Sequence, residues 1–231
     1  MELALALPLL LLLSLGVVQL VLLQQARLLI EYAAFSAVRT GVVWNGSLPR
    51  MRSAAMFATL PLYGRTDTLG ALVATQRRQQ ALDEAIRQRG GGGLVQVDTL
   101  NPRHSPELER AARRVNEIAW EELDLDGVGC FAEGETAPDQ QRDEVLRAAT
   151  VLHAQVQVLF ELKVPLANAA FFWAWRRLHA AAPDEAQLAA LGRGTASLGE
   201  PGAPRRRFFL PLTANYRMRM QSNFFRKWVM H

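Results

Sequence analysis

The first 23 residues, MELALALPLLLLLSLGVVQLVLL, restrict the fold more than any other part of this 231-residue chain. Residues 3–23 carry no charge, and their only polar side chains are Ser14 and Gln19. At about 1.5 Å per residue, a helix over these residues is about 31 Å long, which matches the hydrocarbon thickness of a bilayer. The segment is therefore predicted to be a helix, and its surroundings indicate which kind.

Three interpretations of this segment compete: a cleaved secretory signal, a buried core helix and a retained transmembrane helix. A signal is disfavoured because no basic residue precedes the apolar run and no Ala-x-Ala-like cleavage site follows it. A core helix is disfavoured because Leu occurs on every side, which is typical of lipid contact. We favour the transmembrane helix, in which Pro8 and Gly16 are tolerated. Arg27 and Arg39 follow the span, but two basic residues are too few to fix its orientation.

The helix is predicted to continue beyond the membrane, because no helix breaker occurs between Gln25 and Gly41. A helix over residues 3–40 would be about 57 Å long. One face stays apolar at helical spacing, through Leu28, Tyr32, Phe35, Val38 and Val42. Two compatible interpretations of this face remain open: it packs on the chain's own globular domain, or it packs against copies or partners.

The composition of residues 46–231 indicates one further domain with its own core. The formal net charge is only +4, and the basic residues are scattered apart from the run at residues 205–207. We therefore expect no nucleic-acid partner. The single cysteine, Cys130, excludes an intramolecular disulfide.

Two alternating segments are the clearest evidence for a sheet. Residues 154–164 carry apolar side chains at the even positions, which predicts a strand with one buried face that ends at Pro165. Residues 212–221 alternate in the same way, with the polar outward face of an antiparallel sheet. A shorter strand is predicted at residues 94–99, and helices at residues 66–89, 105–120 and 168–182, the first of them capped by Thr66 or Asp67. A looser, Met- and Ala-rich stretch is predicted up to residue 64, and a Gly- and Pro-rich loop at residues 192–204. Together these elements predict an α+β fold with a small antiparallel sheet, several helices and a long N-terminal helix.

The sequence contains no recognisable catalytic or metal-binding arrangement. Its four histidines, His104, His153, His179 and His231, are far apart and lack metal-ligand spacing. The run at residues 124–127 is similar to the beginning of a calcium loop, but its glycine comes two places too early. We therefore expect no enzyme activity, no cofactor and no metal.

An aromatic cluster at residues 171–175 leaves one alternative function open. We interpret these side chains as part of the core. If they line a pocket instead, the chain is a single-pass, membrane-tethered sensor or ligand-binding domain.

The residue order at the N-terminus supports a comparison with a known family. Glu2 and an apolar stretch with Pro8 are followed by Leu-Leu, then by residues 16–18 (Gly-Val-Val), a Gln-rich exit and an Ala-rich helix at residues 32–39. This order resembles the N-terminus of TadE-like proteins, the minor pseudopilins of the tight-adherence (Flp-type) pilus machinery. The resemblance covers about the first 45 residues, and residues 160–166 and 210–214 are more loosely similar.

The resemblance implies a bacterial, pilin-like protein related to type II and type IV secretion. Residues 1–45 would form the transmembrane and protruding helix, and residues 46–231 a periplasmic α+β domain on the inner membrane. Its partners would be the lipid bilayer, other pilins or pseudopilins and the inner-membrane Tad machinery, and its role would be assembly. The resemblance implies that the assembly residues lie in the N-terminal helix: Glu2, Pro8, Tyr32 and Phe35.

The resemblance also implies a leader peptide. In pilins of this broad type, a prepilin peptidase removes a short basic leader a few residues before a glutamate. No leader precedes Glu2 in this sequence. We expect that the start codon was assigned too late.

Overall fold

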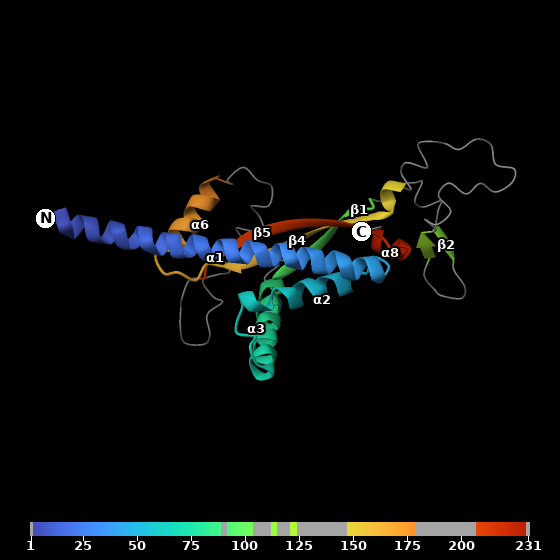
Figure 1. The fold of residues 1–231 in the computed structure, drawn as a ribbon, viewed down its shortest axis with the longest axis horizontal. Helices are drawn as coiled ribbons and strands as arrows, with labels where there is room; N and C mark the ends of the chain where they lie inside the picture. The colour runs from blue at the N-terminus through green and yellow to red at the C-terminus, as the bar shows by residue number, and fades with distance from the viewer. Residues whose placement is uncertain are drawn as a thin grey trace. The chain divides into compact units, whose positions relative to one another are not determined.

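The computed structural model (Figure 1) describes residues 2–88, 92–103, 112–114, 121–123, 147–178 and 207–229. For residues 2–5, 112–114, 121–123, 226 and 229 it describes the backbone alone. The elements, in chain order, are α1 (Glu2–Val43), α2 (Leu48–Ala58), the 3-10 helix η1 (Leu60–Leu62), α3 (Leu69–Arg87), β1 (Val95–Asn101), β2 (Ala112–Arg114), β3 (Glu121–Leu123), β4 (Val151–Glu161), α6 (Ala167–Leu178), β5 (Phe209–Arg219) and α8 (Arg226–Val229). The predicted α+β class and long N-terminal helix are confirmed.

The chain divides into two compact units, which are described separately below. Unit 1 consists of Met1–Ile30, Thr59–Gln96 and Gln157–Leu212. Unit 2 consists of Glu31–Ala58, Val97–Val156 and Thr213–His231. Helix α1 and strands β1, β4 and β5 each contribute residues to both units.

Strands β1, β4 and β5 form an antiparallel sheet in which β4 is the central strand. Two backbone hydrogen bonds fix the register of β4 and β5: Leu162 N–H donates to the Phe208 carbonyl (2.9 Å), and Met220 N–H donates to that of Thr150 (2.8 Å). Burial alternates along β4, with the even positions buried, so the predicted one-sided strand is confirmed. Strand β5 begins earlier than predicted, and its predicted inward face is less covered than expected, because Tyr216 is exposed.

Helix α1 is uninterrupted over 42 residues, and the predicted continuation beyond the apolar run is confirmed. It ends in a glycine-type cap: Asn45 has a φ of 53°, and Gly46 N–H donates to the Gly41 carbonyl at 2.9 Å. Ser222 completes this cap with two further hydrogen bonds. Its Oγ accepts from Asn45 N–H (3.1 Å) and donates to the Val42 carbonyl (2.9 Å). The C-terminal segment of unit 2 therefore completes the end of α1.

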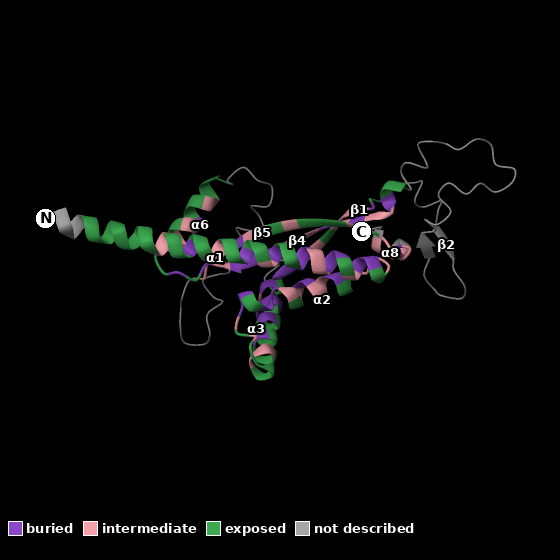
Figure 2. Ribbon diagram, in the orientation of Figure 1, coloured by how far each residue is buried: buried purple, intermediate pink, exposed green. Residues whose placement is uncertain are grey.

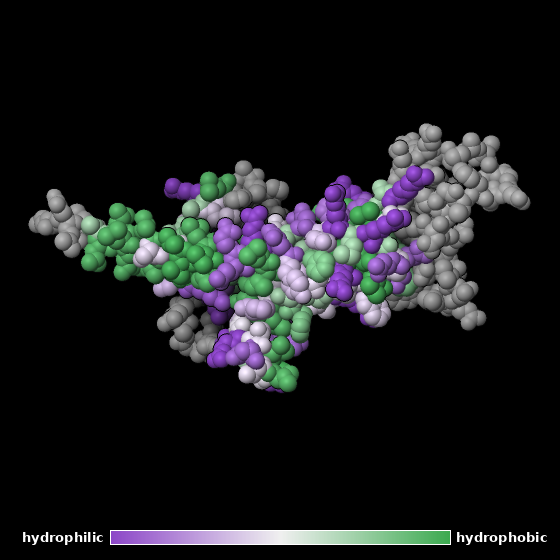
Figure 3. Space-filling view, in the orientation of Figure 1, coloured by the Kyte–Doolittle hydropathy of each residue, from purple (hydrophilic) through white to green (hydrophobic). Residues whose placement is uncertain are grey.

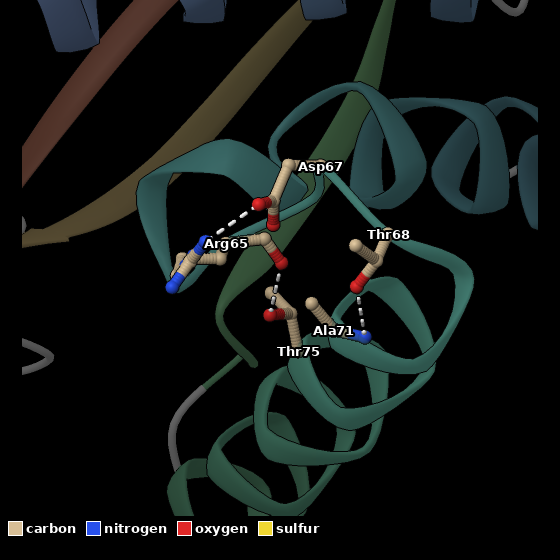
Figure 4. Close-up of polar contacts among 5 residues, drawn as sticks. All are labelled: Arg65, Asp67, Thr68, Ala71 and Thr75. Atoms are coloured by element: carbon tan, nitrogen blue, oxygen red, sulfur yellow. Dashed lines mark hydrogen bonds and ion pairs between the residues drawn. The ribbon is translucent and has the colours of Figure 1, made fainter.

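Helix α3 of unit 1 begins one residue after Thr68, whose Oγ1 accepts a hydrogen bond from Ala71 N–H at 3.2 Å (Figure 4). The sequence predicts Thr66 or Asp67 as this cap, and that prediction is wrong. Asp67 accepts instead from the Arg65 guanidinium at 2.6 Å, and this hydrogen bond lowers the pKa of the carboxyl. Since Asp67 already has a partner, the hydroxyl of Thr68 is the group that satisfies the helix N-terminus.

Two other predictions need correction. Residues 48–58 form α2, where the sequence indicated a looser stretch. Residues 112–114 form strand β2 and not part of a helix, and the strand is antiparallel to β3, with Arg113 opposite Glu122 and Arg114 opposite Glu121. Pairing with β3 satisfies backbone hydrogen-bonding groups of these residues, and this contact outweighs the helix propensity of Ala and Arg. The other residues of the predicted helix 105–120, the end of the helix 168–182 and the loop 192–204 lie outside the described residues.

The N-terminal helix as the candidate functional site

The first part of α1, in unit 1, exposes an apolar surface on all sides. Every residue from 6 to 14 is exposed, and six of these are leucines (Figures 2 and 3). From Ala6 to Val43 the helix is long and apolar enough to cross a membrane, by length and composition. Water-soluble chains usually bury such a surface, and helices that contact lipid expose one. Pro8 lies inside this helix without ending it, as membrane helices permit.

Both polar side chains of the predicted span make hydrogen bonds within unit 1. Ser14 Oγ donates to the Leu11 carbonyl of its own helix at 2.9 Å. Gln19 is fully buried, and its Oε1 accepts from Val164 N–H at 3.1 Å. Its Nε2 has no hydrogen-bond partner among the described residues. A bilayer core offers no water to polar groups, so the bonds of Ser14 Oγ and Gln19 Oε1 suit a lipid-embedded helix, whereas Gln19 Nε2 does not meet this requirement among the described residues.

The segment that covers Gln19 is the connection between β4 and α6. Lys163 in this connection donates from Nζ to the Leu62 carbonyl at 2.7 Å. Tyr63 donates from its hydroxyl to the Leu159 carbonyl at 3.1 Å. Burial, with the negative charges of nearby Glu161 and Asp83, raises the pKa of Tyr63, so this hydroxyl keeps its proton. One hydrogen bond thus joins the connection that meets Gln19 to η1, and a second joins Tyr63, just after η1, to β4.

Helix α6 approaches α1 at Gly16. A Cβ at Gly16 would lie 3.9 Å from Cε2 of Phe171, an ordinary contact distance. Phe172 is buried and packs against Phe208, with ring centroids 5.1 Å apart, whereas Trp173 is exposed. Phe172 therefore belongs to the core, as the sequence predicted, but the same prediction is wrong for Trp173.

The remainder of α1, in unit 2, buries a face of small residues: Ala33, Ala34, Ala37, Val38, Gly41 and Val42. Gly41 permits the closest approach, because a Cβ there would lie 2.6 Å from Cδ2 of Leu152 and 2.7 Å from Sδ of Met51. This part of the helix packs on the chain's own sheet and on α2. Only small side chains fit at this contact, and this explains why alanines occupy this face of the helix.

The predicted assembly residues are separated by this packing. Phe35 is half-buried and meets Tyr216 of β5 edge-on, with ring centroids 5.2 Å apart. Tyr32 lies 6.3 Å from Phe35 and is exposed. Pro8 is exposed, and Glu2 is the first residue of α1, with a side chain outside the described set. Tyr32 and Pro8 are thus accessible to a partner, while Phe35 supports the chain's own domain.

Sequence reasoning assigned no role to Gln19. The sequence did contain an indication: a glutamine within an apolar run costs free energy unless a hydrogen-bond partner meets it. Its partner, a backbone N–H far along the chain, has no sequence signature. No group of three or more His, Cys, Asp or Glu side chains within the described residues is placed to hold a metal ion.

Comparison of the chain with family models, with curated proteins and with solved structures finds no match.

Proposed function

We propose that this chain is a membrane-anchored, pseudopilin-like component of a Tad/Flp-type pilus or secretion apparatus. It acts in assembly through its N-terminal helix, which lies in the bacterial inner membrane, with the α+β domain in the periplasm. The work is done by surfaces that bind other subunits, and the role needs no catalytic group.

One observation carries this proposal: a single uninterrupted helix has two different surfaces. Its first part exposes apolar side chains on all sides, and its later part buries a face of small residues against the domain. A simple tether needs no rigid connection to its domain. A helix that has an apolar anchor in its first part and a domain packed on its later part offers its remaining exposed surface to neighbouring subunits, which is what an assembly element requires.

Glu2 provides the residue-level part of the proposal. It lies at the beginning of the apolar run, where a carboxylate is costly unless it is paired. In an assembly, the amino terminus of a neighbouring subunit would pair with it. The carboxylate would then favour insertion of the next subunit at one defined depth.

The test is Glu2→Leu in the native host. We expect the variant protein to remain in the membrane fraction at its normal level, because the substitution only lengthens the apolar run. Pilus number, counted by electron microscopy, should fall to that of a strain without the gene. Glu84→Leu makes the same substitution on an exposed glutamate of α3 and should leave piliation normal. Normal piliation with Glu2→Leu would contradict the proposal.

A further inference from the structure

Helix α6 carries an exposed apolar surface next to the membrane-spanning part of α1. Three large apolar side chains are exposed there: Leu166, just before the helix (64%), and Trp173 (54%) and Leu178 (83%) within it. Arg176 and Arg177 lie in its last turn. The Arg176 guanidinium is 5.3 Å from the centre of the Trp173 ring. Tryptophan and arginine at the edge of an apolar surface are typical of the membrane–water interface.

The position of α6 along α1 fixes its depth. Gly16, which meets Phe171, and Gln19, which meets the connection before α6, precede Leu23 by 7 and 4 residues. At about 1.5 Å per residue, these contacts lie about 10 Å and about 6 Å inside the end of a span over residues 3–23. Interfacial amphipathic helices bury their apolar face by about 5–10 Å. The contacts therefore place α6 at the depth that such helices occupy.

The backbone before α6 supports the same position. Leu166 has a φ of 64°, a left-handed conformation that is strained for a branched apolar residue. The strain is accepted at a residue whose side chain is exposed. In water the exposed Leu166 side chain gains nothing from burial, whereas in lipid it is stabilised.

We infer that α6 lies in the membrane–water interface, with Leu166, Trp173 and Leu178 among the acyl chains and Arg176 and Arg177 at the lipid phosphates. This inference rests on the membrane anchoring in the proposed function, and not on the role in assembly. The domain is then fixed to the bilayer at two places, α1 and α6. The connection between β4 and α6 then separates Gln19 from lipid. Gln24 and Gln25 lie just beyond the span, at the membrane surface.

The inference is tested by spin-label depth measurements on the full chain in vesicles of phosphatidylcholine and phosphatidylglycerol. Cys130→Ser removes the only cysteine, and single cysteines then carry a nitroxide at residue 173 or, independently, at residue 178. Leu10→Cys in α1 is the lipid reference. Leu69→Cys, at the first residue of α3 and 84% exposed, is the aqueous reference.

We expect the ratio of oxygen accessibility to nickel-chelate accessibility at residues 173 and 178 to be several-fold higher than at residue 69 and to approach that at residue 10. Equal ratios at residues 173, 178 and 69, with residue 10 in lipid, would overturn the inference and leave the anchoring intact. An aqueous ratio at residue 10 would overturn both. Because the Glu2 test measures piliation and not depth, failure of the assembly role is distinguishable from either result.

Discussion

Two arginines in the exposed apolar part of α1 are expected to remove the protein from the membrane. Leu10 and Leu13 are both exposed, and they lie near the middle of the predicted span. An arginine at the centre of a membrane helix costs about 2.5–3.5 kcal/mol on the insertion scale, so Leu10→Arg with Leu13→Arg costs about 5–7 kcal/mol. Most of the variant should be released by alkaline carbonate extraction, while the wild-type protein stays in the membrane pellet.

Leu69→Arg is the matched control, since it places the same charge on an exposed leucine of α3. It should leave the protein in the pellet. If the double variant resists carbonate extraction as the wild type does, the first part of α1 does not cross the bilayer, and the anchoring is wrong.

Gly46→Ala is expected to destabilise unit 2 strongly. Gly46 has a φ of 74°, and an added Cβ would lie 2.5 Å from Cδ1 of Phe224, a fully buried ring. The left-handed conformation costs a residue with a Cβ about 1–2 kcal/mol, and crowding in a packed site adds about 1–3 kcal/mol. The free energy of unfolding should fall by about 2–5 kcal/mol, measured by thermal or denaturant unfolding of the full chain in detergent.

Gly70→Ala is the control with the opposite expected sign. Gly70 lies in the first turn of α3, and a Cβ there would meet nothing within 4 Å. Replacing glycine in a helix by alanine stabilises it by about 0.5–1 kcal/mol. Unchanged stability of Gly46→Ala would show that the turn after α1 is not held against the C-terminal segment as described.

The elements predicted best are those with long, regular patterns. The length of α1 follows from the absence of a breaker before Gly41, and the buried face of β4 follows from strict alternation. Helix α2 was missed because its Met- and Ala-rich residues 48–58 have a weak apolar pattern. Strand β2 was missed because Arg113 and Arg114 favour a helix locally, and their partners in β3 are not adjacent in sequence.

The candidate site was predictable only in part. Exposed Pro8 and Tyr32 agree with a surface available to partners, but Phe35 is half-buried against Tyr216. The spacing of apolar residues places side chains on a face of the helix but does not indicate how far each is covered. The bond to Gln19 and the cap completed by Ser222 join residues more than 100 positions apart. Contacts of this kind are decided by tertiary packing and have no local signature.

The most direct test of an assembly role is to find which surface contacts other proteins in the native host. A photoreactive phenylalanine analogue at Tyr32 lies on the helix, and the same analogue at Phe57 lies on α2. The two native side chains are almost equally exposed, at 57% and 61%, so the comparison is matched. We predict that residue 32 forms discrete crosslinks to a second copy or to another membrane subunit with its own N-terminal apolar helix, and that residue 57 does not. Crosslinks from residue 57 alone, or none from residue 32 in cells that assemble pili, would contradict the claim that this chain acts through its N-terminal helix.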